Sequence, residues 1–178
     1  MGGSGPPPGP PGGALLDRVF LVTGYLSGTL FFGLAFFITY DVLARKWGTA
    51  LGIPTTQVTD EIAGYMLVLA STWGFAYTLK SDAHVRIDVL LPHLPAPLRA
   101  AMDALALAIM AVFAGMVAWR SWILVQDSWE TGIRSSTYLL TPLWIPQAIL
   151  VVGFALLAVA AAVMLLTLAA SWPARAAP

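Results

Sequence analysis

The sequence predicts an all-α membrane protein with four transmembrane helices. Of its 178 residues, 58% are hydrophobic and only 10% are charged. A soluble domain carries roughly 25% charged residues, because it must cover its surface with groups that bind water. Four apolar stretches, separated by polar segments, each come close to the ~20 residues that a helix needs to cross the hydrocarbon core of a bilayer.

The N-terminal 13 residues, MGGSGPPPGPPGG, predict a disordered segment because they offer no apolar face to bury. The membrane domain is expected to cover residues 14–172. Its first span, at about residues 19–40, contains no charged residue. Asp41 and Arg45 follow it, as charged groups at the membrane surface would. A short loop that includes Gly48 should then connect the first two spans.

The second span is predicted at about residues 62–79. Asp60 and Glu61 precede it and Lys80 follows it. Acidic side chains suit this position, because the N-terminal end of a helix carries the positive end of its dipole. The two acids therefore mark the start of the second membrane helix.

Residues 80–99 form the most polar part of the chain. Apolar residues alternate there with His84, Arg86 and Asp88. A period of two indicates an extended segment, but the run is short enough that an interfacial helix between spans two and three remains the other interpretation. Pro97 suits the first turn of the helix that follows.

The third and fourth spans are predicted at about residues 102–125 and 144–168. Tryptophans gather at the end of the third span, as in the aromatic belts at membrane surfaces. The fourth span lies in a long uncharged run, and its prolines, Pro142 among them, predict that regular helix begins near Trp144. Residues 173–178 form a C-terminal tail.

Basic residues predict the topology. With four spans, both termini and the central loop share one side, which holds five of the basic residues: Arg18, Lys80, Arg86, Arg99 and Arg175. The other side holds three, Arg45, Lys46 and Arg134, and Arg120 lies near its membrane edge. Because cytoplasmic loops are enriched in lysine and arginine, both termini are predicted to be cytoplasmic.

The composition points away from several kinds of chemistry. The formal net charge is zero, so a nucleic-acid backbone would find no basic surface. The chain has no cysteine, and its two histidines, His84 and His93, share one loop, which excludes a haem held between helices. No nucleophile, base or metal-ligand set occurs within reach in the predicted spans. We therefore expect no catalytic site, no metal, no cofactor and no bound substrate in this chain.

The order and spacing of several short motifs resemble the DctQ-type small permease subunit of tripartite ATP-independent periplasmic (TRAP) transporters. The resemblance covers about residues 17–168. Its motifs, in chain order, are Asp41 with Arg45, Asp60-Glu61, Trp73-Gly74, Lys80, His84-Val85-Arg86-Ile87-Asp88, Arg99, Gly132, Ser135-Ser136-Thr137, Pro142-Leu143-Trp144 and Gly153.

The resemblance implies a multi-pass protein of the bacterial inner membrane. Its implied partners are a large DctM-type permease subunit, a periplasmic DctP-type solute-binding protein and membrane lipids. Uptake of a solute, generally an organic acid, would be driven by an ion gradient, with the coupling ion, sodium in most of the family, held by the large subunit. This chain would brace the stationary part of that subunit, a role that needs apolar contact area and no charge in mid-membrane.

The resemblance also suggests sites of contact. Residues His84, Arg86 and Asp88 would lie at the cytoplasmic surface and hydrogen-bond across the headgroup layer. The carboxylates of Asp60 and Glu61 would lie on the periplasmic side, seating either the large subunit or the binding protein. Pro142 and Trp144 would set the angle and depth of the last helix, and Asp41 with Arg45 would anchor the first. The main alternative is a membrane anchor subunit of a respiratory or redox complex; a small intramembrane enzyme is a third.

Overall fold

The computed structural model describes residues 14–51, 58–80 and 95–176. These residues form four helices: α1 (Ala14–Leu51), α2 (Thr59–Lys80), α3 (Ala96–Thr131) and α4 (Trp144–Ala176). Each is long and apolar enough to cross a membrane. The prediction of an all-α protein with four membrane-spanning helices is therefore confirmed.

Helix α1 runs further than the apolar pattern indicated. It has 38 residues and continues to Leu51, so the expectation that the connecting loop includes Gly48 is wrong. Loss of hydrophobicity does not stop a helix whose backbone hydrogen bonds remain intact, and an ion pair between Asp41 and Arg45, four residues apart, stabilises the polar part. At 1.5 Å per residue α1 is about 57 Å long, nearly twice the hydrocarbon thickness of ~30 Å. It must tilt, project from the bilayer, or both.

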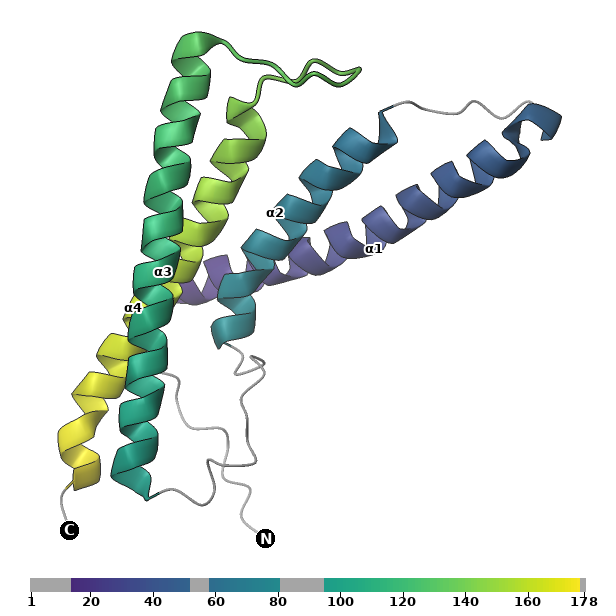
Figure 1. The fold of residues 1–178 in the computed structure, drawn as a ribbon. Coiled ribbons are helices and arrows are strands. Elements are labelled where there is room, and N and C mark those ends of the chain that lie inside the picture. The colour runs from purple at the N-terminus through teal and green to yellow at the C-terminus, as the bar shows by residue number, and fades with distance from the viewer. Residues whose placement is uncertain (1–13, 52–57, 81–94, 177–178) are drawn as a thin grey trace, which may run out of the picture.

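The helices pack in the spatial order α1, α2, α4, α3, which differs from their order in the chain. Helices α1 and α2 diverge from the close pair α3 and α4, so the bundle opens toward one end (Figure 1). Interhelical contacts show that α2 runs antiparallel to α1 and parallel to α4, while α3 runs antiparallel to α4. The chain thus passes up and down four times, as the topology prediction requires.

A shared core lies where the two pairs of helices converge. All four contribute buried side chains to it: Phe20, Ala76, Leu79, Leu107, Ala114, Leu157, Ala160 and Ala161. Half of these residues are alanines. In lipid, where burial of apolar surface gives little net gain, close van der Waals contact between small residues is the main source of helix association.

The close crossing of α1 and α2 depends on small residues. The hydroxyl of Ser27 donates a hydrogen bond to the backbone carbonyl of Ala70 on α2. A methyl group on Gly74 would lie 2.6 Å from the Ser27 oxygen, and one on Gly24 would overlap the ring of Tyr77. Glycine is therefore required at both positions for the helices to approach this closely.

The crossing of α2 and α4 follows the same principle. Gly153 of α4 faces Thr72 of α2 so closely that a Cβ atom at position 153 would overlap the threonine side chain. Nearby, the indole nitrogen of Trp73 donates a 3.3 Å hydrogen bond to the carbonyl of Ile149. One steric and one polar contact thus position α4 against α2.

Two local predictions are confirmed at the helix ends. Pro97 lies in the first turn of α3, where a missing backbone N–H costs little, and α4 begins at Trp144. Gly132 ends α3 in the left-handed conformation, with φ of 63°. The predicted disordered terminus, residues 1–13, and the segment with His84, Arg86 and Asp88 lie outside the described residues.

Candidate functional site

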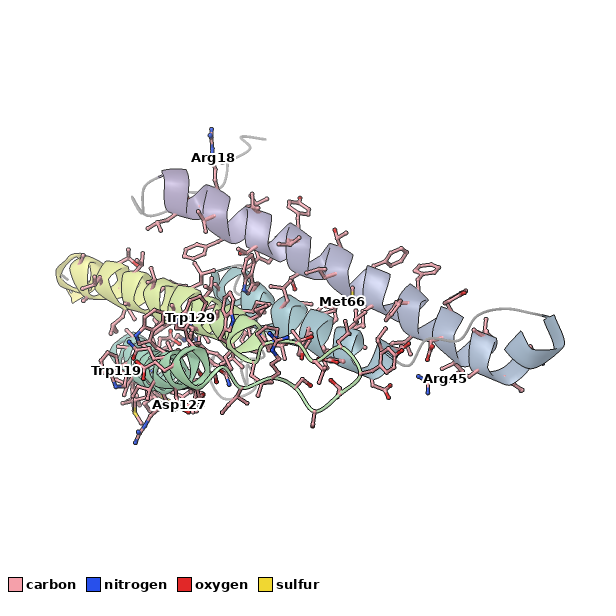
Figure 2. The ribbon with its side chains drawn as sticks, turned by 90° about the horizontal axis from the view of Figure 1, so that it is seen from above. Arg18, Arg45, Met66, Trp119, Asp127 and Trp129 are labelled. Atoms are coloured by element: carbon pink, nitrogen blue, oxygen red, sulfur yellow. The ribbon has the colours of Figure 1, made fainter. Side chains whose placement is uncertain are left out.

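Three segments far apart in the chain meet at the open end of the bundle. They are the first turns of α2, the hairpin at residues 132–143 and the first turns of α4. The hairpin reaches from the α3–α4 pair across to the start of α2 (Figures 1 and 2). The structure therefore brings two of the predicted sites, Asp60-Glu61 and Pro142-Trp144, to the same end of the molecule.

The carboxylate of Glu61 joins α2 to the hairpin. Tyr65, one turn further along α2, donates a 2.6 Å hydrogen bond to one carboxylate oxygen. The hydroxyl of Thr137 donates a hydrogen bond to the other. The side chain of Ser135 lies 2.5 Å from that hydroxyl and extends the network into the hairpin. Glu61 is buried by these contacts, which makes it a connecting residue within the chain.

A short ladder of backbone hydrogen bonds shapes the hairpin. The N–H of Ser135 donates to the carbonyl of Thr141 at 2.8 Å, and the N–H of Leu143 donates to the carbonyl of Ile133 at 3.2 Å. An isolated antiparallel bridge pairs Arg134 with Pro142. These bonds hold Ser135 and Thr137 on a defined turn that faces α2.

Aromatic packing marks the junction of α3 and α4. The rings of Trp129 and Trp144 meet edge to face, with centroids 5.0 Å apart. Trp129 lies toward α4, whereas Trp119 and Asp127 lie on the outer side of α3 (Figure 2). Tryptophan is enriched where membrane and water meet, so we expect the hairpin end of the bundle to lie at the headgroup layer.

The predicted pair Asp41 and Arg45 lies on α1. Its charged groups are 2.6 Å apart; the aspartate side chain is 7% exposed and the arginine side chain 48% exposed. Since α1 and α2 are antiparallel and Gly33 faces Met66, residue 41 lies near the first turn of α2. Asp41 is thus a buried acid that the arginine neutralises, with the guanidinium directed outward.

A groove opens between α2, α4 and the hairpin, with a volume of about 540 Å³. Ten residues line it: Asp60, Glu61, Gly64, Tyr65, Val68, Ser135, Thr137, Pro146, Gln147 and Leu150. No basic side chain is among them. The side-chain oxygen of Gln147 is buried and has no hydrogen-bond partner in the structure.

Sequence analysis identified part of this site. Tyr65 could have been recognised, because a tyrosine four residues after a glutamate shares its helix face. No pattern in the sequence pointed to Gln147. The contact between Glu61 and Thr137 could not be predicted either, because the two residues are 76 positions apart in the chain. Within the described ranges, no group of three or more histidine, aspartate or glutamate residues could hold a metal ion.

Comparison with known proteins agrees with this architecture. Residues 34–171 match the family described as "Tripartite ATP-independent periplasmic transporters, DctQ component". The chain is also similar to the "Isethionate TRAP transporter permease protein DctMQ" of Oleidesulfovibrio alaskensis, with 27% identity over 148 residues. That match covers 82% of this chain and 22% of the relative. No solved structure matches the chain.

Proposed function

The chain belongs to the DctQ component family of tripartite ATP-independent periplasmic transporters, and from this membership we propose that it braces the large permease subunit of such a transporter. The family is a transporter component, so the protein is a multi-pass membrane subunit and not an enzyme. The respiratory-anchor alternative receives no support from the comparisons.

The main support for the proposal is the large apolar surface that α1 exposes. This helix packs mainly along α2, and much of its length exposes large apolar side chains. Phe32 and Phe36, 68% and 63% exposed, form an edge-to-face pair there. Gly28 lies one turn before them with open space around its Cα. Aromatic side chains beside small residues suit the close packing of a partner's helix.

The interior of the bundle favours a scaffold over a conduit. Among the described residues, the buried polar side chains are mainly serine and threonine hydroxyls, and the two buried acids, Asp41 and Glu61, lie toward the open end of the bundle. Solutes and ions that cross a membrane need polar groups to replace their lost water. Solute and coupling ion would therefore bind to the large subunit, and sodium is the ion we expect.

The solute is expected to be an organic anion. The printed name of the similar permease from Oleidesulfovibrio specifies isethionate, which is such an anion, and a periplasmic binding protein would deliver the solute. This chain matches 22% of that relative, which leaves length for a larger permease component in the same polypeptide. We place the protein in the bacterial inner membrane, as its family suggests, with both termini in the cytoplasm, as its basic residues predict.

Reconstitution tests the proposal. Proteoliposomes containing the large subunit, this chain and the binding protein should take up solute when a sodium gradient is imposed. Omitting this chain should abolish or strongly reduce uptake. Uptake that continues unchanged without it would refute the bracing role.

A second measurement locates the contact. The double substitution Phe32→Ala/Phe36→Ala on α1 should lower the amount of large subunit that co-purifies. The control is Ile109→Ala/Phe113→Ala on α3, whose side chains are exposed to a similar degree, 61% and 60%. If both double substitutions lowered the amount of co-purified large subunit equally, α1 would not be the contact surface.

A further inference from the structure

The groove between α2, α4 and the hairpin changes character along its length. Four of its polar residues, Asp60, Glu61, Ser135 and Thr137, lie at the start of α2 and in the hairpin, and the other two, Tyr65 and Gln147, lie within the first two turns of α2 and α4. The apolar side chain of Val68 lies two turns further along α2, and Leu150 lies two turns into α4. The groove therefore presents polar groups at one end and hydrocarbon toward the middle of the helices.

The position of the groove matches this gradient. The edge-to-face pair Trp129 and Trp144, at the same end of the bundle, is expected at the depth of the lipid headgroups. The polar end of the groove then lies in the headgroup layer, and its apolar end lies beside the lipid chains. An amphiphile aligned with the bilayer would contact both ends in the correct order.

The polar groups of the groove define the headgroup. Glu61 is occupied by Tyr65 and Thr137, whereas Asp60 has no hydrogen bond or ion pair with another described residue. The groove thus offers one exposed carboxylate, that of Asp60, and no basic side chain lines it. A complementary ligand must supply positive charge and N–H donors, which a primary ammonium group does.

The size of the groove favours a lipid over a single basic side chain. Its volume of about 540 Å³ lies within the roughly 300–1,000 Å³ of pockets that bind small molecules. One lysine side chain would leave most of it empty. We propose that the groove binds phosphatidylethanolamine, with its ammonium group at Asp60 and an acyl chain along Val68 and Leu150. This proposal depends on the membrane location of the chain and not on its role in transport.

Lipid competition tests the proposal on the full-length chain. The purified protein is mixed with equal amounts of phosphatidylethanolamine and phosphatidylcholine that carry identical acyl chains, and bound lipid is measured by native mass spectrometry. The choline headgroup keeps the charge but has no N–H donor. A charge-assisted hydrogen bond should favour phosphatidylethanolamine about tenfold. Equal retention of the two lipids would overturn the proposal.

Two substitutions locate the lipid. Gly64 lines the groove, and a Cβ atom there would meet no atom of the protein. Gly64→Leu should therefore fill the groove and remove bound lipid without destabilising the helix, since leucine has the higher helix propensity. Gly28→Leu adds the same side chain in open space on α1 and should leave lipid binding unchanged. Retention of lipid by Gly64→Leu would contradict the assignment.

The charge is tested separately. Asp60→Asn should reduce the preference for phosphatidylethanolamine to near the value for phosphatidylcholine. Asp127→Asn, on the outer side of α3 and away from the groove, should not. If Asp60→Asn released the large subunit while the lipid preference persisted, the carboxylate would serve a basic residue of that partner and the lipid assignment would be wrong.

Discussion

The hydroxyl of Thr137 donates a hydrogen bond to the carboxylate of Glu61, across 76 positions of sequence. The threonine belongs to the hairpin between α3 and α4, and the glutamate belongs to the first turn of α2. This bond crosses the open end of the bundle, where the two pairs of helices diverge (Figure 1). It therefore holds the hairpin against the start of α2, beside the groove.

Removing this bond should loosen the hairpin. In Glu61→Ala or Thr137→Val, the amide of Ser135, which bonds to Thr141, should exchange its hydrogen faster, on the order of tenfold. Exchange measured by mass spectrometry would show this, and the double variant should be hardly worse than either single one. Thr131→Val serves as the control, because that hydroxyl bonds within its own helix to Asp127. Additive effects of the two substitutions would indicate that the residues are not coupled.

Gly74→Ala should destabilise the crossing of α1 and α2. Its new methyl group would lie 2.6 Å from the oxygen of Ser27, and overpacking of this kind costs about 1–3 kcal/mol. Removing that oxygen with Ser27→Ala should restore most of the lost stability. The single Ser27→Ala variant should lose only about 0.6 kcal/mol, a typical value for a hydrogen bond between membrane helices. Unfolding in mixed micelles would measure the stability of the two single variants and the double variant. If the double variant were no more stable than Gly74→Ala, the contact between residues 27 and 74 would be contradicted.

Gly153→Ala should destabilise the protein more than Gly115→Ala, the same substitution on α3. A Cβ atom at position 153 would overlap Thr72 and approach its backbone carbon to 3.0 Å, and backbone cannot rotate away. We expect a loss of about 1–3 kcal/mol in unfolding free energy. Gly115→Ala on α3 meets no atom within 4 Å and should be neutral or stabilising, because alanine favours helix. Equal behaviour of the two variants would mean that α2 and α4 do not cross at this point.

The aromatic pair on α1 should matter for assembly and not for folding. Phe32 and Phe36 contact each other and are largely exposed. Their replacement by alanine should leave the thermal midpoint of the isolated chain within a few degrees of wild type, as surface changes do. Binding of the large subunit should weaken about tenfold or more, since buried aromatic side chains often dominate interfaces. Titration of labelled large subunit in nanodiscs would measure it, and unchanged affinity would exclude this surface.

Much of the fold could be read from the sequence because partition into a bilayer depends on local composition. The starts of α2 and α4, at Thr59 and Trp144, fall within a few residues of the predicted spans. The end of α1 was misjudged, because hydropathy reports where a helix leaves hydrocarbon and not where its hydrogen bonds stop. Asp41 and Arg45 follow the apolar run, yet they lie inside the helix.

The sequence by itself determined the number of membrane helices and their alternating direction. These properties follow from sums over neighbouring residues and from the free-energy cost of charge in hydrocarbon. Only the tertiary structure decided that α2 lies between α1 and α4, that Thr137 reaches Glu61, and that Gln147 faces a groove. Such relationships depend on the angles at which helices cross, and those angles are set by a few contacts between distant residues, such as Gly153 against Thr72.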